Sequence, residues 1–177
     1  MSRGTGIGGH HRGHRGATDE WLTPPALIAA LGPFDLDPCA PVQRPWNTAA
    51  RHYTVEDDGL RKRWFGRVWL NPPYGPQVGR WLKRLAEHGD GMALVFARTE
   101  TEAFQQYVWA RADAVLFLFG RLHFHDPSGQ VAANNAGAGS VLIAYGAANA
   151  ERLERSALVG KFIRLKPRQM ETQEAAS

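Results

Sequence analysis

The chain is poor in the features that define several large classes of protein. It has one cysteine in 177 residues, which excludes a disulfide framework and suits a reducing cytosol. Its longest apolar runs, such as residues 114–119, are too short to span a bilayer, and the amino terminus has no apolar stretch typical of a signal peptide. The content of 44% hydrophobic and 10% aromatic residues is sufficient for one buried core. We therefore expect a cytoplasmic protein without a membrane segment.

Acidic residues are absent from residues 59–86, although the chain as a whole has a net charge of only +4. The same window contains seven basic residues, so a polyanion would meet a positive surface there. This imbalance favours nucleic acid over protein as a partner, and it does not separate DNA from RNA. The alternative is an ordinary solvated helix face, because an apolar stripe also runs through residues 77–88. The predicted DNA-binding residues are Arg61, Lys62, Arg63, Arg80, Lys83 and Arg84.

The two ends of the chain differ in composition from its middle. Residues 1–17 are rich in glycine, histidine and arginine and contain no acidic residue, and residues 167–177 are polar. We interpret both as disordered tails, and we favour weak attraction to phosphate over metal capture by the histidines of the first. The remaining residues, 18–166, are predicted to form a single domain.

The tetrapeptide Asn71-Pro72-Pro73-Tyr74 directly follows the apolar run of residues 68–70. The lone pair of an exocyclic amine on a base is delocalised into the ring, so a site that makes this amine attack a methyl sulfonium must accept hydrogen bonds from its NH2 group. The Asn71 amide oxygen and the Pro72 carbonyl are two suitable acceptors. Two consecutive prolines cannot continue a sheet ladder, so they leave those oxygens free to face a ligand. Tyr74 offers a ring on which an extruded base can stack. These residues favour amino-group methylation, with a stiff turn at a strand end as the alternative.

A second element upstream ends at a carboxylate. Residues 34–37 alternate apolar and acidic side chains, as a half-buried strand does, and Pro38 follows Asp37. Ligands of open α/β sheets bind beyond the carboxyl ends of the strands, so we expect Asp37 and the tetrapeptide to face one crevice. Just before this strand, Thr23 as N-cap and Pro24 at the first helical position open a predicted helix, whose amino terminus would suit a carboxylate.

Strands and helices alternate along the chain, which predicts a mainly parallel α/β sheet. Residues 91–96 have the near-continuous apolar character of a central strand that is covered on both faces. Two later strands, separated by a polar, glycine-rich stretch at residues 126–139, predict an antiparallel hairpin at the edge of the sheet. The predicted strands cover residues 34–37, 67–71, 92–97, 114–119, 121–125 and 140–145, and the predicted helices cover residues 24–31, 77–88, 100–112 and 149–158.

An ordered series of short motifs resembles the phage-type DNA N6-adenine methyltransferase (Dam) family over most of residues 18–146. The motifs are Trp21-Leu22-Thr23-Pro24, Phe34-Asp35-Leu36-Asp37-Pro38-Cys39-Ala40, Asn47, Tyr53-Thr54, Asp57-Asp58-Gly59-Leu60, Trp64-Phe65-Gly66, Asn71-Pro72-Pro73-Tyr74-Gly75, Ala97-Arg98-Thr99-Glu100-Thr101 and Gly120-Arg121-Leu122-His123-Phe124. The resemblance implies a Rossmann-like fold that binds S-adenosyl-L-methionine and transfers its methyl group to adenine N6 in DNA. The implied catalytic residues, which would hold the target base, are Asn71, Pro72, Pro73 and Tyr74. The implied cofactor-binding residues are Trp21, Thr23, Pro24, Asp37, Pro38, Asp57 and Asp58. Of the two neighbouring aspartates, Asp57 and Asp58, only one would contact the cofactor.

Several alternatives remain open at this level. Similar tetrapeptides occur in methyltransferases that act on RNA or protein glutamine. The turn at residues 40–45 contains no glycine, unlike the cofactor turn of many methyltransferases, so a DNA-binding accessory protein without catalysis is a further candidate. Cys39 after Pro38 suggests a thiolate nucleophile, but a small buried cysteine is the better interpretation there. His123 and His125 have no third ligand at convincing spacing, so we expect no metal site.

Overall fold

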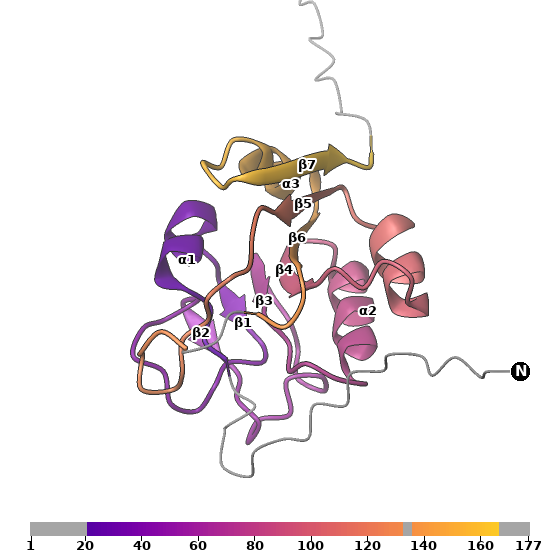
Figure 1. Ribbon diagram of the computed structural model, residues 1–177. Coiled ribbons are helices and arrows are strands. Elements are labelled where there is room, and N and C mark those ends of the chain that lie inside the picture. The colour runs from indigo at the N-terminus through magenta and orange to yellow at the C-terminus, as the bar shows by residue number, and fades with distance from the viewer. Residues whose placement is uncertain (1–20, 133–135, 167–177) are drawn as a thin grey trace, which may run out of the picture.

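The computed structural model describes residues 21–132 and 136–166, and both predicted tails lie outside these residues. Figure 1 shows a sheet that runs through the molecule with helices packed against it. The elements in chain order are α1 (Pro25–Leu31), β1 (Leu36–Asp37), β2 (Arg51–His52), β3 (Val68–Leu70), α2 (Val78–His88), β4 (Gly91–Phe96), the π-helix η1 (Phe104–Trp109), β5 (Ala114–Leu118), β6 (Ser140–Tyr145), α3 (Ala147–Glu154) and β7 (Gly160–Arg164). No helix within the described ranges is long and apolar enough to cross a membrane.

Seven strands form one sheet in the order β2-β1-β3-β4-β6-β5-β7. The pairings of β2 with β1, β1 with β3 and β3 with β4 are parallel. Parallel strands end at the same edge of a sheet, so Asp37 at the end of β1 and Asn71 directly after β3 emerge side by side. This half of the sheet therefore positions the two motifs that the sequence singled out.

The other half of the sheet is antiparallel, so the prediction of a mainly parallel sheet was wrong. β6 pairs with both β4 and β5, and β5 pairs with β7, over longer stretches than any of the parallel pairs. The predicted antiparallel hairpin of β5 and β6 is present, but it is not an edge, because β6 is inserted beside β4 and β7 covers β5. All six residues of β6 are buried, which explains why it takes an internal place between two neighbours.

The strand predicted at residues 121–125 does not form. Only His125 makes isolated bridges there, with Leu22 and with Val131. Phe124 nevertheless is buried and packs in the core, so the segment buries its apolar side chain without a ladder of its own. Two strands were not predicted, β2 and β7.

The sheet separates two apolar layers, because successive residues of a strand face opposite sides. Val68 and Leu70 of β3 belong to a cluster formed with α2 and η1. Trp69, between them, belongs to the opposite cluster, which includes residues of α1 and α3. The protein is thus a mixed α/β structure with helices on both faces of the sheet, and this packing fixes the strand ends around the site.

Candidate active site

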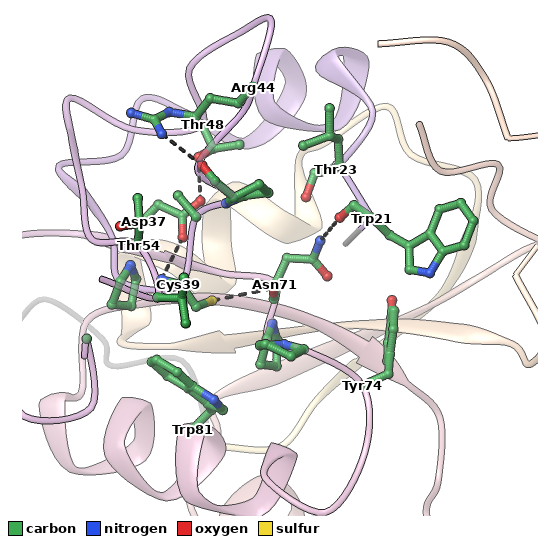
Figure 2. A pocket seen from close by; sticks show the side chains of 18 of the residues that line it. Trp21, Thr23, Asp37, Cys39, Arg44, Thr48, Thr54, Asn71, Tyr74 and Trp81 are labelled. Atoms are coloured by element: carbon green, nitrogen blue, oxygen red, sulfur yellow. Dashed lines mark hydrogen bonds between the residues drawn. The ribbon is translucent and has the colours of Figure 1, made fainter. Parts of the chain in front are cut away.

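A cavity of about 550 Å³ opens at the sheet edge where β1 and β3 end (Figure 2). This volume lies within the range of sites that bind small molecules. The walls come from the segment before α1, the loops after β1 and β2, the tetrapeptide after β3, and one residue of α2. The lining residues are Trp21, Leu22, Thr23, Asp37, Pro38, Cys39, Ala40, Pro41, Arg44, Trp46, Thr48, Thr54, Val55, Asp58, Gly59, Asn71, Pro72, Pro73, Tyr74 and Trp81.

The amide of Asn71 has its donor in use and its acceptor without a partner. Nδ2 donates to the carbonyl oxygen of Trp21 at 3.0 Å (Figure 2). Because that carbonyl can only accept, the amide must turn its nitrogen toward Trp21 and its oxygen away. This oxygen, Oδ1, is buried and has no hydrogen-bond partner among the described residues. A buried acceptor in this state costs about 1–3 kcal/mol, which a ligand that donates a hydrogen would relieve.

Tyr74 lines this cavity, and one face of its ring is covered by another aromatic side chain. The ring stacks on Phe96 with centroids 4.1 Å apart and planes inclined by 10°, and the edge of Phe124 lies at a centroid distance of 6.0 Å. The hydroxyl is buried without a described partner, and burial raises the pKa of Tyr74, so the phenol is neutral. One face of Tyr74 is thus already covered by Phe96. Of the two prolines before it, Pro72 is buried and Pro73 exposed, and both line the cavity.

Asp37 is a buried carboxylate at the end of β1. Its Oδ2 accepts a hydrogen bond of 2.5 Å from the Thr48 hydroxyl, and its Oδ1 accepts one of 3.1 Å from the backbone N–H of Cys39. Desolvation by burial raises the pKa of Asp37 to about 6, although these bonds and the charge of Arg44 act in the opposite direction. The carboxylate is therefore ionised but poorly solvated at neutral pH, which makes it a strong acceptor for ligand hydroxyl groups.

Two side chains hold the loop between β1 and β2 against this carboxylate. Arg44 donates from Nη1 to the carbonyl of Pro41 at 2.9 Å, and its buried Nε has no partner within the described ranges. His52 accepts at Nε2 from the backbone N–H groups of Thr48 and Ala49, at 3.3 and 3.4 Å. Partial burial, with the Arg44 charge in addition, lowers the pKa of His52 to about 4, so the ring is neutral and able to accept. These contacts fix the position of the Thr48 hydroxyl.

Two indoles fix the segment before α1. The hydroxyl of Thr23 accepts from Nε1 of Trp69 at 3.3 Å, and its carbonyl accepts from Nε1 of Trp46 at 3.1 Å. Because Trp69 uses the hydroxyl, Thr23 does not cap α1, and the N-cap is Pro24, with proline also at the first helical position. The prediction of Thr23 as N-cap was therefore wrong. Trp21 and Thr23 line the cavity, whereas Pro24 does not.

Of the two aspartates after β2, Asp58 lines the cavity and Asp57 does not. Asp57 accepts at Oδ2 from the backbone N–H of Thr54 at 2.9 Å, and this bond lowers the pKa of Asp57. Its role in the structure is to fix the turn. Asp58 has a left-handed backbone, with φ of 52°, and forms an exposed ion pair of 3.5 Å with Arg61. Asp58 is thus the member of the pair that the structure brings to the site.

Gly59 brings this loop into contact with the end of β1. A Cβ atom at Gly59 would lie 1.8 Å from the carbonyl oxygen of Pro38, a distance that no side chain tolerates. Its own carbonyl accepts from Nε1 of Trp64 at 2.8 Å, and Trp64 in turn stacks near Trp81 in the cavity floor. Residues 40–45 contain no glycine, and the glycine that closely approaches the end of β1 is instead Gly59 in the loop after β2.

The basic residues predicted to bind DNA differ in the ion pairs and hydrogen bonds that their side chains form within the protein. Arg61 pairs with Asp58, and Lys83 pairs with Glu87 at 3.8 Å; all four side chains are more than half exposed. Such pairs contribute little to stability and break readily when a phosphate competes. Because Asp58 also lines the cavity, Arg61 stands next to its rim.

The other four basic residues lie along the same surface. Arg84 lies over the ring of Trp64, with its guanidinium carbon 5.1 Å from the centroid, and donates to the carbonyl of Lys62. It is therefore committed to internal contacts. Arg80 donates to the side chain of Gln77, the N-cap of α2, and Lys62 and Arg63 are exposed. The segment from 61 to 63 is thus joined to α2 and presents its cations to solvent.

Neither of the other candidate chemistries gains support from the geometry. Cys39 donates from Sγ to the carbonyl of Asn71 at 3.4 Å, and burial together with the nearby Asp37 charge raises the pKa of the Cys39 thiol well above its ordinary value. A thiol in this state is a poor nucleophile. His123 and His125 do not belong to a candidate metal site, since the described residues contain no group of three side chains arranged to hold a metal ion.

Part of the cavity wall was not identified from the sequence. The residues that pattern analysis missed come mostly from one loop without periodicity, between β1 and β2, and they are Arg44, Trp46 and Thr48. Thr54 belongs to a family-like motif but had been given no role. Trp81 had been assigned to the apolar stripe of α2, where it also contributes to the core.

Comparison with known proteins gives one family. Residues 12–161 match the family described as DNA N-6-adenine-methyltransferase (Dam). Neither a curated protein nor a solved structure gives a significant match. The family match covers most of the chain and includes every residue that lines the cavity. The chain therefore belongs to the Dam family of DNA N-6-adenine methyltransferases.

Proposed function

We propose that this protein transfers a methyl group from S-adenosyl-L-methionine to the N6 amino group of adenine in DNA. The family match supports the substrate and the reaction class. The observation that carries the proposal for this site is the buried, unpartnered Oδ1 of Asn71. An amine that donates a hydrogen to this oxygen satisfies it and is held in one orientation, which is the main requirement for in-line transfer.

The residues around the cavity fit the proposed cofactor. Ionised, poorly solvated Asp37 suits the ribose hydroxyl groups, and Arg44, with a buried Nε that lacks a described partner, suits the carboxylate. Trp21, Thr23 and Pro38 complete the proposed contacts, and Asp58 is favoured over Asp57 because it lines the cavity. When bound, the cofactor supplies a methyl group on a positively charged sulfur, which makes the methyl carbon electrophilic.

The tetrapeptide orients the adenine in this proposal. Oδ1 of Asn71 and the carbonyl of Pro72 accept the two amine hydrogens, which directs the nitrogen lone pair at the methyl carbon. Held by Asn71 and Pro72, the amine nitrogen would bond to the methyl carbon that the cofactor supplies, the electron pair of the broken carbon–sulfur bond would stay on sulfur, and the surplus amine proton would leave to solvent. Pro73 keeps the backbone rigid, and the ring of Tyr74 supports the base. No covalent intermediate is needed, which agrees with the raised pKa of Cys39.

The sheet supports a Rossmann-like methyltransferase arrangement. β1, β3 and β4 run parallel, and an antiparallel β6 lies between β4 and β5. The cavity lies beyond the carboxyl ends of β1 and β3, where open α/β sheets bind their ligands.

The proposal is tested by incubating the protein with labelled S-adenosyl-L-methionine and unmethylated DNA, and by identifying the modified nucleosides by mass spectrometry. We expect N6-methyladenine from the wild type and none from Asn71→Ala, with cofactor affinity largely unchanged in that variant. Gln106→Ala is the matched control, because it removes an exposed amide on η1 outside the cavity. Unchanged turnover in Asn71→Ala would remove the central role of this residue.

Other products would point to the alternatives. N4-methylcytosine would keep the mechanism and change the base. Methylated RNA or methylated glutamine, with unmodified DNA, would change the substrate class. No affinity for the cofactor at saturating concentration would support a DNA-binding accessory protein without catalysis.

A further inference from the structure

A second cavity, of about 470 Å³, adjoins the candidate active site. It lies between the start of α2, the end of β4 and the segment that leads into η1. Among the described residues, Tyr74 alone lines both cavities. The lining residues are Tyr74, Gly75, Pro76, Val78, Gly79, Leu82, Val95, Phe96, Arg98, Thr101, Ala103 and Phe104.

The second cavity is lined mainly by apolar and small residues. Leu82, Val95 and Phe104 are the buried apolar members of the lining. Gly75 has nothing within 4 Å of a Cβ position, and Gly79 allows α2 to approach the chain before η1, where a Cβ would lie 3.2 Å from that of Ala103. The cavity is therefore shaped for an apolar group and reached past an uncrowded loop.

Two residues give the cavity its chemical preference. Phe96 is half-buried, stacks on Tyr74 and lines the second cavity but not the first. Arg98 is exposed and forms no ion pair within residues 21–132 and 136–166. An aromatic wall beside a cation suits a ligand that joins a flat, neutral ring to an anionic group, and a nucleotide has both, in its base and its phosphate.

We assign the target amine to the first cavity, because Asn71, whose amide oxygen has no described partner, lines that cavity and not the second. Tyr74 lines both cavities, so the second cavity lies directly beside the place assigned to the target amine. We propose that the second cavity binds the nucleotide next to the target adenine, with its base against Phe96 and its phosphate on Arg98. This inference rests on DNA as the substrate.

The occupant must be unpaired, since a base within a duplex has to be extruded before it can enter a pocket. Thr101, the one other polar side chain besides Tyr74 and Arg98, donates to the carbonyl of Arg98 and accepts from the N–H of Phe104. It is therefore occupied and does not read base edges. The site binds by stacking and charge, so it tolerates different bases and favours a single-stranded or opened segment of DNA.

The test uses a single-stranded thymine oligonucleotide that contains one adenine with 2-aminopurine beside it, on one side or the other. Fluorescence of 2-aminopurine is quenched when the ring stacks. We expect quenching by the wild type for one of the two positions, and loss of quenching in Phe96→Ala and Phe96→Leu. The leucine variant keeps most of the volume and removes the aromatic face. Phe119→Ala, which removes an exposed ring outside both cavities, is the control and keeps the quenching.

A second measurement tests the phosphate contact of Arg98. Because Arg98 is exposed, its replacement should not disturb folding. Arg98→Ala should weaken binding of the same oligonucleotide several-fold and reduce the slope of log affinity against log salt by about 0.7, the value for one single-strand phosphate. Arg155→Ala, at the C-cap of α3, should leave both unchanged. No quenching at either position, quenching that survives in the Phe96 variants, or an unchanged salt slope in Arg98→Ala overturns the proposal. Methylation of the adenine in this oligonucleotide reports the proposed function independently of these readouts.

Discussion

The hydroxyl of Thr48 donates a hydrogen bond of 2.5 Å to the carboxylate of Asp37, inside the protein and at the end of β1. This bond joins the loop after β1 to the strand end that faces the cavity. It also lowers the pKa of Asp37 against the larger effect of burial, which raises that pKa to about 6. Thr48, 11 positions further along the chain, therefore favours the ionised form of Asp37 against the larger effect of burial.

The affinity for S-adenosyl-L-methionine should depend on pH through Asp37. A ligand hydroxyl binds the ionised carboxylate more strongly than the protonated one, so affinity should be constant above about pH 7 and fall below pH 6, by up to about tenfold per unit. Calorimetric titration between pH 5 and pH 8 measures this. Thr48→Val removes the bond that favours ionisation, so the midpoint should move to higher pH. A midpoint near pH 4 in the wild type would show that Asp37 does not govern binding.

The same carboxylate should reduce the stability of the folded protein at neutral pH. Its pKa is higher in the folded than in the unfolded state, so the folded state binds the proton more tightly and stability falls as pH rises from about 4 to 6. Above pH 6 the loss is constant at about 3 kcal/mol. Asp37→Asn removes the charge and should raise Tm at pH 8, by about 2–4 °C per kcal/mol. Thermal unfolding at pH 8 and pH 4 tests this, because the difference from wild type should nearly vanish at pH 4.

Much of the site could be anticipated because its residues follow from local rules. Asp37 stands at the end of an alternating strand, and the tetrapeptide follows an apolar run, so both were expected at carboxyl strand ends. Parallel pairing of β1 with β3 then brings them together. The loop from Pro41 to Thr48 has no periodicity, and its contribution depends on long-range contacts such as that of Trp46 with Thr23. No local pattern encodes such contacts.

The errors in the predicted fold also arise because local sequence patterns do not encode long-range contacts. β2 has two residues, too few for a period to show, and β7 has exposed and half-buried residues without a clean alternation. The place of β6 between β4 and β5 depends on its pairing with β4, more than 40 positions earlier in the chain, which apolar content alone does not specify. At residues 121–125 the alternation was real, but tertiary packing of Phe124 replaced the expected strand pairing.

Replacement of Gly59 should damage the site without touching a predicted catalytic residue. In Gly59→Ala the new methyl group would lie 1.8 Å from the carbonyl oxygen of Pro38, so the loop that carries Asp58 must move away from β1. We expect a loss of about 1–3 kcal/mol in the free energy of unfolding and a clear loss of cofactor affinity. Gly137→Ala is the matched control, because nothing lies within 4 Å of a Cβ there. Denaturant unfolding and cofactor titration measure both effects, and equal behaviour of the two variants would contradict the close approach.

The exposed cations after the second aspartate should contribute to DNA affinity in a measurable, salt-dependent way. Lys62 and Arg63 are exposed and directly follow Arg61, which pairs with the cavity-lining Asp58, so both are accessible to phosphates. The double variant Lys62→Ala, Arg63→Ala should bind duplex DNA more weakly and reduce the slope of log affinity against log salt by about 0.9 for each phosphate that is no longer neutralised. Lys161→Ala on β7, at the far edge of the sheet from β2, is the control and should leave the slope unchanged. Fluorescence anisotropy at four salt concentrations separates the two results. Equal slopes in all three proteins would mean that DNA approaches the cavity over another surface, and would leave the charge of residues 61–63 as an ordinary solvated face.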